Sequence, residues 1–360
     1  MDQKEQKTVL RWGRFDPFYS RNRVCKSLLQ DLGWNVVDFN VHLSCLGDAE
    51  AVIRGVGKPD LLWIPCFRQR DAAAAIRWAK RRNVPVIFDP FISSWDKKVL
   101  ERQIWRAEEK RAQRLLRWET RLFNQVDCLL ADTACHAEFY HNQMGVPLKD
   151  IHLLYIGTDE SVFKPGDDPV RDPASPLRVL YHGCYVPLHG TEHIVEAARL
   201  TQHLPIKWDF LGWGKFKRPT EERARGVSNI TFLDKVPYTE VPRIIKSADI
   251  VLGVFGTTEK ASRVIANKVF EALACGRPVI NEHSAGYPEV ARQTPALTFI
   301  PPGDPQALAA AVTRFMDHRS ELPALNKEAR RFFEEHLSMR VIKKQLERAI
   351  DYALKAADIA

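Results

Sequence analysis

The sequence predicts an α/β protein made of two domains, each a doubly wound parallel sheet covered by helices. Short β-rich segments alternate with amphipathic stretches along the 360 residues, as expected when helices connect parallel strands. The strand candidates also fall into two comparable sets, and residues 163–173, rich in proline and aspartate, separate them as a linker. Parallel sheets bind ligands beyond the carboxyl ends of their strands, so we expect the reaction to take place in a cleft between two facing domains.

The strands are predicted from short runs rich in β-branched and aromatic residues. In the first domain they are expected over residues 8–12, 35–39, 61–65, 84–89, 128–132 and 152–156. In the second domain they are expected over residues 178–182, 207–211, 230–233, 250–254, 278–281 and 297–300. Residues 339–359 carry apolar side chains at helical spacing and are predicted to form a helix.

Length, composition and cysteine usage limit the class of protein. A chain of 360 residues is long enough for two ordinary domains, and a hydrophobic content of 45% excludes a mainly disordered protein. No segment approaches the ~20 consecutive apolar residues of a membrane-spanning helix, and the charged start of the chain is unlike a secretory signal. The seven cysteines form no CxxC pair, so we expect buried thiols, no zinc site and a cytoplasmic location.

The formal net charge of +8 suits a nucleic acid, an anionic membrane or a phosphorylated substrate as partner. No RNA- or DNA-binding motif is visible, so nucleic acid is not expected as a partner. The net charge does not choose between the other two.

The most informative segment is residues 267–280, which predicts a short helix followed by a strand. Lys268 and Glu271 lie three residues apart, so both side chains fall on one face of the helix. Gly276 is expected to end the helix. A helix N-terminus beside cations favours phosphate, because free backbone N–H groups and the positive end of the dipole point at the anion. A neighbouring carboxylate can accept hydroxyl protons from a ribose or a sugar, so this segment predicts a sugar-nucleotide pocket.

The same segment resembles the donor-binding signature of the retaining glycosyltransferase family 4, whose members have the two-domain GT-B fold. Other segments that carry the resemblance are 177–190, 210–214, 232–237 and 247–250. It is ordered over about residues 175–310 and weaker over the first 165 residues. It implies two Rossmann-like domains, one over residues 1–165 that binds the acceptor and one over residues 166–338 that binds the nucleotide sugar. The helix over residues 339–360 is then expected to pack back on the first domain.

The resemblance also implies how the donor is held. By this resemblance, Glu271 binds the ribose hydroxyls. The residues themselves favour a diphosphate beside it, because Lys268, Arg263 and Lys260 converge on the N-terminus of one helix. These cations meet the negative charge that develops on the leaving diphosphate, so no bound metal is expected. The nucleoside-diphosphate sugar is the donor substrate, and no cofactor is expected. Lys268 and Arg263 are therefore candidate catalytic residues, with solvation of a loop as the alternative role of such cations.

At one position the chain departs from the family pattern, which has two glutamates separated by seven residues. Counting back from Glu271, the first glutamate is replaced by Arg263, and Glu259 lies four residues further upstream. Two explanations stay open. Either Glu259 takes the place of the missing glutamate because the loop follows a different path, or Arg263 itself contacts phosphate or an acidic sugar.

Further donor-site candidates lie in loops that follow predicted strands. His189 and Gly190 precede a helix at Thr191, where a histidine can donate to phosphate and a glycine permits close approach of the backbone. The remaining donor-site candidates are Asn267, Gly212, Val236 and Gly13. For His189 the alternative is a structural histidine, and for Gly13 it is an ordinary turn.

Two predictions concern the first domain only. Asp89 ends a predicted strand and is the candidate for stabilising positive charge at the anomeric carbon or orienting the acceptor hydroxyl, although Asp-Pro also starts turns. Residues 97–121 are predicted to form one helix with a core-facing stripe and a basic face. The alternative use of this helix is a peripheral contact with an anionic membrane, with Trp105 or Trp118 near the headgroups.

The sequence therefore predicts a glycosyltransferase that moves a hexose-type sugar from a nucleoside-diphosphate sugar to a glycan, a glycolipid or another acceptor hydroxyl, and the family resemblance implies that the reaction is retaining. Synthesis of a cell-surface polysaccharide or glycoconjugate, in the cytoplasm or at the inner face of the membrane, is the expected setting. Two alternatives remain. One is a catalytically silent GT-B-like adaptor, favoured only by the missing glutamate. The other is a nicotinamide-dependent oxidoreductase, which would need a GxGxxG motif that the first domain lacks.

Overall fold

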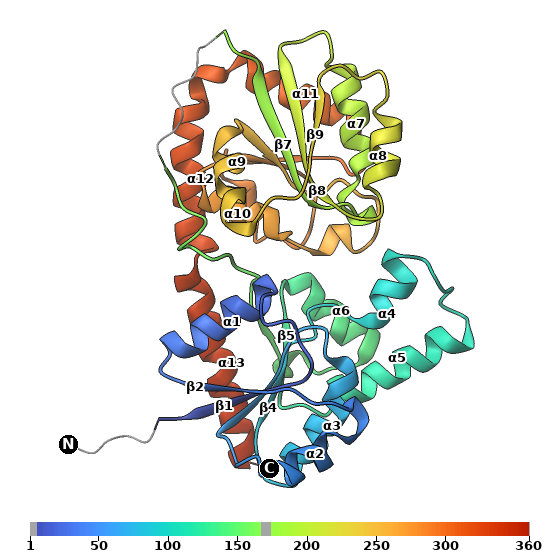
Figure 1. Ribbon diagram of the computed structural model, residues 1–360, viewed down its shortest axis with the longest axis vertical. Helices are drawn as coiled ribbons and strands as arrows, with labels where there is room; N and C mark the ends of the chain where they lie inside the picture. Colours follow the sequence, from blue (N-terminus) through green and yellow to red (C-terminus); the bar gives the residue numbers. More distant parts are fainter. Residues whose placement is uncertain (1–5, 167–173, 360) are drawn as a thin grey trace, which may run out of the picture. The chain divides into compact units, whose positions relative to one another are not determined.

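The structure of the protein, a computed structural model, describes residues 6–166 and 174–359. The chain divides into two compact units. Unit 1 consists of the chain up to Gly157 together with the segment from Met339 onward, and unit 2 consists of Thr158–Ser338. Each unit contains a six-stranded parallel sheet, so the predicted α/β class with two doubly wound sheets is confirmed (Figure 1). Among the described residues, no helix is both long enough and apolar enough to cross a membrane.

The sheet of unit 1 has the strand order β2-β1-β3-β4-β5-β6. Its strands are β1 (Thr8–Trp12), β2 (Asn35–Phe39), β3 (Leu61–Ile64), β4 (Val86–Phe88), β5 (Cys128–Ala131) and β6 (Ile151–Leu153). The main helices are α1 (Ser20–Asp31), α2 (Gly47–Ile53), α3 (Gln69–Lys80), α5 (Lys110–Phe123), α6 (Ala134–Met144) and α13 (Met339–Ile359). Every residue of β3, β4 and β5 is buried, as expected for central strands covered on both faces.

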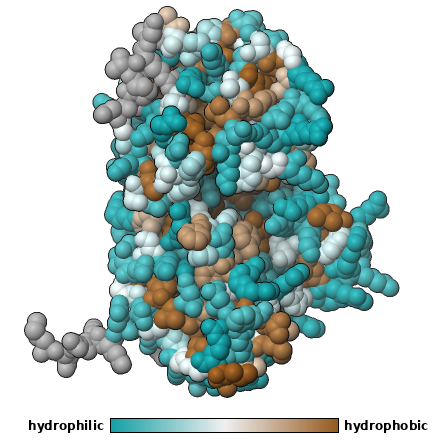
Figure 2. All heavy atoms as spheres, viewed as in Figure 1, coloured by the Kyte–Doolittle hydropathy of each residue, from teal (hydrophilic) through white to brown (hydrophobic). Residues whose placement is uncertain are grey.

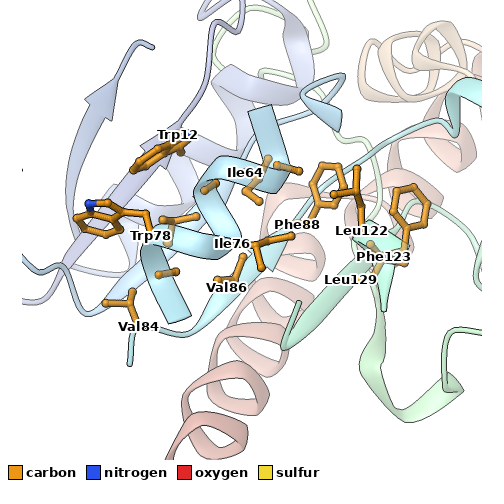
Figure 3. Packing of buried hydrophobic residues seen from close by; sticks show 14 of the residues in the cluster. Trp12, Ile64, Ile76, Trp78, Val84, Val86, Phe88, Leu122, Phe123 and Leu129 are labelled. Carbon is orange, nitrogen blue, oxygen red and sulfur yellow. The ribbon is translucent and has the colours of Figure 1, made fainter. Parts of the chain in front are cut away.

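Two hydrophobic cores cover the two faces of this sheet. On one face, α3 and α5 pack against the strands (Figure 3). The rings of Trp12 and Trp78 lie 5.4 Å apart there, and the rings of Phe88 and Phe123 lie 5.5 Å apart. On the other face, α1 packs with α13. The apolar residues of α13 recur at helical spacing and reach this core through Leu346 and its neighbours, which is how the last helix joins unit 1.

The sheet of unit 2 has the strand order β12-β11-β10-β7-β8-β9. Its strands are β7 (Leu177–Cys184), β8 (Ile206–Trp213), β9 (Ile230–Leu233), β10 (Ile250–Leu252), β11 (Val279–Glu282) and β12 (Leu297–Ile300). The helices are α7 (Thr191–Leu200), α8 (Lys217–Arg223), α9 (Val241–Ser247), α10 (Asn267–Ala274), α11 (Pro305–Asp317) and α12 (Leu322–His336). The core on one face joins α7 and α11 to the strands, and α10 packs with α12. The predicted helix that starts at Asn267 is confirmed.

The two units divide earlier in the sequence than the predicted boundary at residue 165. Phe163 is fully buried, and its ring lies 5.1 Å from the ring of Tyr238, which belongs to unit 2. The residues just before 166 therefore already pack with unit 2. Residues 167–173 of the predicted linker lie outside the described residues.

The prediction of one helix over residues 97–121 is wrong. A short α4 (Ser94–Asp96) runs into a π-helical turn (Lys97–Glu101), and regular helix resumes only with α5 at Lys110. Between these two segments the backbone hydrogen bonding is not helical, because the carbonyl of Lys98 accepts a hydrogen bond from the amide of Ile104 at 2.8 Å. Trp105 lies between two cations, with the Lys98 Nζ 4.2 Å and the Arg111 guanidinium 5.0 Å from its ring centroid. These local contacts replace the helix that the apolar spacing predicts.

The packing of α13 on unit 1 gives a stability prediction. Leu346 is fully buried, so Leu346→Ala should lower the free energy of unfolding by about 2–5 kcal/mol through lost transfer energy and the cavity left behind. Arg348→Ala, at an exposed position of the same helix, should change it by less than about 0.5 kcal/mol. Urea unfolding monitored by tryptophan fluorescence measures both. Equal stability of the two variants would mean that α13 does not contribute to the fold of unit 1.

Candidate functional site

The loops at the carboxyl edge of the unit 2 sheet pack into one layer around the N-terminus of α10. Backbone hydrogen bonds join the loop after β7 to the loop after β10. The amide of Phe255 donates to the carbonyl of His189 at 3.3 Å, and the amide of Gly256 donates to the carbonyl of Leu188 at 3.2 Å. Both loops lie at the edge where parallel α/β sheets bind their ligands.

Two predicted site glycines allow this close packing. Gly190 has a φ of +59°, and a Cβ atom at this position would lie 2.2 Å from the carbonyl oxygen of Phe255. Gly212 has a φ of +144°, and a Cβ there would lie 1.9 Å from the carbonyl oxygen of Gly183. Only glycine fits these positions, so the packing of the chain on itself explains both residues. Their contact with a donor stays a prediction.

Lys268 is a buried cation at the start of α10. Its side chain is 4% exposed, and its Nζ lies 4.1 Å from the centroid of the Tyr181 ring. Among the described residues, this Nζ has no hydrogen-bond partner. Burial lowers the pKa of Lys268 to about 7, although the nearby Glu271 opposes the shift. An ammonium in such a place is stabilised by any anion that can approach it.

Glu271 lies one turn further along α10, beside His182 of β7. The Nδ1 of His182 is 3.6 Å from the carboxylate of Glu271. Burial, with a second contribution from Lys268, lowers the pKa of His182 to about 3, so its imidazole is neutral at neutral pH. The predicted pair of Lys268 and Glu271 is thus brought to one place, whereas His182 was missed. The feature that could have indicated His182 is its position near the end of a strand that is buried along most of its length.

His189 does not supply a positive charge to this site. Its Nδ1 lies 2.9 Å from the hydroxyl of Tyr181. Burial, and then the charge of Lys268, lower the pKa of His189 well below its usual value. A neutral imidazole can still donate one hydrogen bond to an anion, but the pH-dependent cation that the sequence allowed is excluded near neutral pH.

The loop between β10 and α10 carries the other predicted cations. Lys260 is 3% exposed, and the Arg263 guanidinium lies 3.7 Å from the carboxylate of Glu259. The side chain of Glu259 is 70% exposed. Glu259 therefore lies at the surface against Arg263, and its position does not favour the explanation that it replaces the missing family glutamate.

Glu282, at the end of β11, is a second residue that the sequence did not indicate. It is 1% exposed, and its Oε2 has no hydrogen-bond partner among the described residues. Burial raises the pKa of Glu282 to about 8, so this carboxyl group is neutral at neutral pH and can donate a hydrogen bond.

An exposed aromatic surface borders the same edge of unit 2. Trp213, at the end of β8, is 49% exposed, and the Nζ of Lys235 lies 4.5 Å from the centroid of its ring. The predicted donor-site residue Val236 is half-buried directly after Lys235. Aromatic rings of this kind stack with planar groups such as nucleobases.

The predicted residues of unit 1 are explained by internal contacts. The carboxylate of Asp89 is 2.7 Å from the Nε of Arg21, and both side chains are 1% exposed. The same guanidinium donates to the carbonyls of Leu154 and Tyr155. Asp89 thus fixes the sheet edge to α1, and its role at the anomeric carbon or the acceptor hydroxyl stays a prediction. Gly13 has a φ of +130°, and a Cβ there would lie 2.8 Å from the carboxylate of Asp71 on α3.

Within the described part of the chain, no group of three or more histidine, cysteine, aspartate or glutamate side chains is placed to hold a metal ion. The groups that can meet an anion in unit 2 are the Lys268 ammonium and the N-terminal amides of α10. Together with the carboxylate of Glu271, they can hold a phosphate beside a hydroxyl-bearing group.

Comparisons with known proteins agree with this arrangement. A family model described as glycosyl transferases group 1 matches residues 176–318, and another described as a glycosyl transferase 4-like domain matches residues 39–157. WcaL of Escherichia coli, a glycosyltransferase assigned to colanic acid biosynthesis, is 28% identical over 219 residues, which cover 57% of this chain and 52% of WcaL. The MMP alpha-(1->4)-mannosyltransferase of Mycolicibacterium hassiacum is 23% identical over 304 residues, covering 82% of this chain and 66% of the relative.

The chain thus spans about half the length of WcaL and about two thirds of the mannosyltransferase. Among solved structures, HepE of Anabaena in complex with UDP and glucose is similar with a TM-score of 0.72. The identity is 16%, and the match covers 96% of this chain and 100% of HepE. At this level of identity the likeness shows the fold.

The lowered pKa of Lys268 predicts how ligand affinity depends on pH. Without a ligand, the ammonium loses its proton above about pH 7, whereas a bound diphosphate holds the proton in place. Affinity for a nucleoside-diphosphate sugar should therefore fall as the pH rises from about 7 to about 9, measured by isothermal titration calorimetry. Lys268→Arg keeps its charge over this range and should give a much flatter profile. Identical profiles for both proteins would contradict the assignment.

Proposed function

The chain belongs to the glycosyltransferase family 4-like proteins of the GT-B fold, and on that basis we propose that it transfers a hexose-type sugar from a nucleoside-diphosphate sugar to an acceptor hydroxyl. The acceptor is a glycan, a glycolipid or a similar molecule of a cell-surface polysaccharide or glycoconjugate. The observation that carries the proposal is the buried ammonium of Lys268 beside Glu271 at the N-terminus of α10.

The energetics of Lys268 favour a diphosphate ligand. Burying an ammonium without a compensating anion costs several kcal/mol, and the lowered pKa reflects this cost. A diphosphate beside Lys268 offsets it with charge-assisted hydrogen bonds, which are about twice as strong as neutral ones. Glu271 then accepts hydrogen bonds from the ribose hydroxyls, a role that suits an ionised carboxylate because it is an acceptor only.

In the proposed reaction, the bond between the anomeric carbon and the diphosphate oxygen breaks, and a bond from that carbon to the acceptor oxygen forms. The acceptor hydroxyl proton passes to an oxygen of the leaving diphosphate. Lys268, Arg263 and the amides of α10 stabilise the negative charge that develops on this group, which lowers the barrier because the charges are already in place. Retention at the anomeric carbon is the stereochemical outcome that we propose.

The relatives suggest which donors to test first. HepE was solved with UDP and glucose, and one relative is a mannosyltransferase. UDP-glucose and GDP-mannose are therefore the first donors for a panel that also includes ADP- and CMP-sugars. A donor that binds only the folded protein raises its melting temperature, so thermal shifts rank the panel before any acceptor is known.

The role of Glu271 gives a test of the proposed activity. Glu271→Gln removes the charge that the ribose hydroxyls need and should lower kcat/KM for the donor by about 10- to 100-fold, the usual effect of losing a hydrogen bond to a charged group. Release of nucleoside diphosphate measures it. Glu335→Gln, at a surface position of unit 2 that is 50% exposed, is the matched control and should leave the rate unchanged. Equal rates in both variants would exclude Glu271 from the donor site, and no turnover with any donor would favour the adaptor.

The position of Arg263 gives a second test. Its guanidinium can only donate hydrogen bonds, so it suits the diphosphate or the carboxylate of an acidic sugar. If the diphosphate is its partner, Arg263→Lys should lower turnover with every donor, because the charge stays but the bidentate fork is lost. If an acidic sugar is its partner, Arg263→Glu should shift preference towards the matching neutral hexose. Product formation with paired acidic and neutral donors separates the two, and unchanged rates and preference would leave Arg263 as a solvated surface residue.

A further inference from the structure

Unit 1 contains a strongly basic pocket of about 460 Å³ that the donor site does not use. Six of its lining residues are basic: Arg14, Arg68, Arg70, Lys97, Lys98 and Arg102. Within the described part of the chain, the lining of this pocket includes no aspartate or glutamate. We call this group of residues and the space between them the basic pocket. Such a concentration of one charge attracts a multiply charged anion.

The fold places the basic pocket at the carboxyl edge of the unit 1 sheet. Arg14 follows β1, Arg68 follows β3 just before α3, and Lys97 follows β4 and α4. Three loops that are distant in sequence therefore converge where an open parallel sheet binds its ligands. The departure from a continuous helix after Glu101 contributes as well, because it leaves Arg102 at the rim of the pocket.

Part of the pocket wall is held in a fixed conformation. The Nε of Arg68 donates to the carbonyl of Phe67 at 2.8 Å, and one of its Nη atoms donates to the carbonyl of Arg14. Phe67 has a φ of +63°, a backbone conformation that residues with a side chain rarely adopt and that persists only where the surrounding structure imposes it. Its ring packs edge-on against Phe91 at 5.5 Å, with the Nζ of Lys97 5.6 Å from its centroid. Strained residues of this kind concentrate at ligand sites.

Two neighbouring carboxylates lie behind the pocket wall, and one of them pairs with Arg68. Asp71 lies 3.7 Å from Arg68, accepts from the amide of Arg14 and is 1% exposed. Glu119 accepts hydrogen bonds from the Ser93 hydroxyl and the amides of Ser94 and Trp95. These carboxylates are buried and engaged in holding the loops. The exposed cations Arg70 and Arg102 and the half-buried Lys98 face the space with no acidic side chain among its lining residues.

The lining of the basic pocket also has an apolar part. Phe67, Trp118 and Leu115 contribute to its walls, and Ile104 at its rim is 54% exposed. A small inorganic anion would use the cations and leave these side chains in water. A phosphate ester, with a charged group and an attached organic part, matches both parts of the lining.

We propose that the basic pocket binds the phosphate or diphosphate group of a phosphorylated acceptor, and so that the acceptor class is a phosphate ester. That the bound phosphate ester is the acceptor rests on the proposed glycosyltransferase function, whereas its binding in unit 1 does not. A concave pocket of about 460 Å³ suits one phosphate ester and its first neighbouring group, in contrast to a flat lipid surface.

Calorimetry on the full chain tests this proposal with octyl diphosphate as the probe and octanol as its uncharged counterpart. Saturating UDP is present, so that the donor site of unit 2 is occupied. Wild type should bind octyl diphosphate and not octanol. The triple variant Arg70→Gln, Lys98→Gln, Arg102→Gln should bind it at least tenfold more weakly. The matched control Lys58→Gln, Lys80→Gln, Lys149→Gln changes three exposed lysines of unit 1 outside the pocket and should bind it as wild type does.

The outcomes separate this proposal from the proposed function. Equal affinity in the two triple variants, no preference for the diphosphate over octanol, or binding only to anionic phospholipid vesicles would each overturn the pocket assignment. Retained UDP binding in both triple variants shows that they fold and leaves the donor assignment intact. Failure of the wild type to bind any nucleotide of the donor panel would instead contradict the proposed function, whatever octyl diphosphate does.

Discussion

The buried ammonium of Lys268 is the interaction on which the account of unit 2 depends. Burial of a lysine in such a place is destabilising even with Glu271 nearby, and its pKa of about 7 reflects that cost. The surrounding structure keeps it there. Its Nζ lies over the face of the Tyr181 ring, and His182 and His189 nearby stay neutral. The loops after β7 and β10 pack against each other at Gly190, where no other residue would fit. An arrangement that disfavours the empty state in this way favours an anionic ligand.

Both units use the same edge of the same kind of sheet, but with different chemistry. In unit 2 one buried cation and a carboxylate share the first turns of α10, which suits a ligand that carries phosphate next to hydroxyl groups. In unit 1 many exposed and half-buried cations surround a pocket with an aromatic wall. The first arrangement selects by burial and hydrogen bonding, whereas the second attracts by charge density and is more sensitive to salt.

The sequence predicted the strands well because short β-branched runs between turn residues have few alternative structures. The prediction of one helix over residues 97–121 failed because apolar spacing does not reveal the backbone hydrogen bond between Lys98 and Ile104, which lies outside the helical pattern. The ion pair of Asp89 could not be predicted for a related reason. Its partner Arg21 lies 68 residues away, and only the folded sheet brings the two together. That Lys268 and Glu271 lie close together was predictable, because residues three apart fall on one face of a helix.

The most direct measurement is the pKa of Lys268 itself, followed by NMR of isotope-labelled lysine side chains, with Lys268→Arg used to assign the signal. The account predicts a midpoint near pH 7 in the free protein, and a rise of at least one pH unit when UDP binds, because the diphosphate stabilises the charged form. A midpoint near the ordinary lysine value in the free protein, or a midpoint that neither UDP nor another nucleoside diphosphate of the donor panel moves, would contradict the central claim that this ammonium is buried to receive the donor diphosphate.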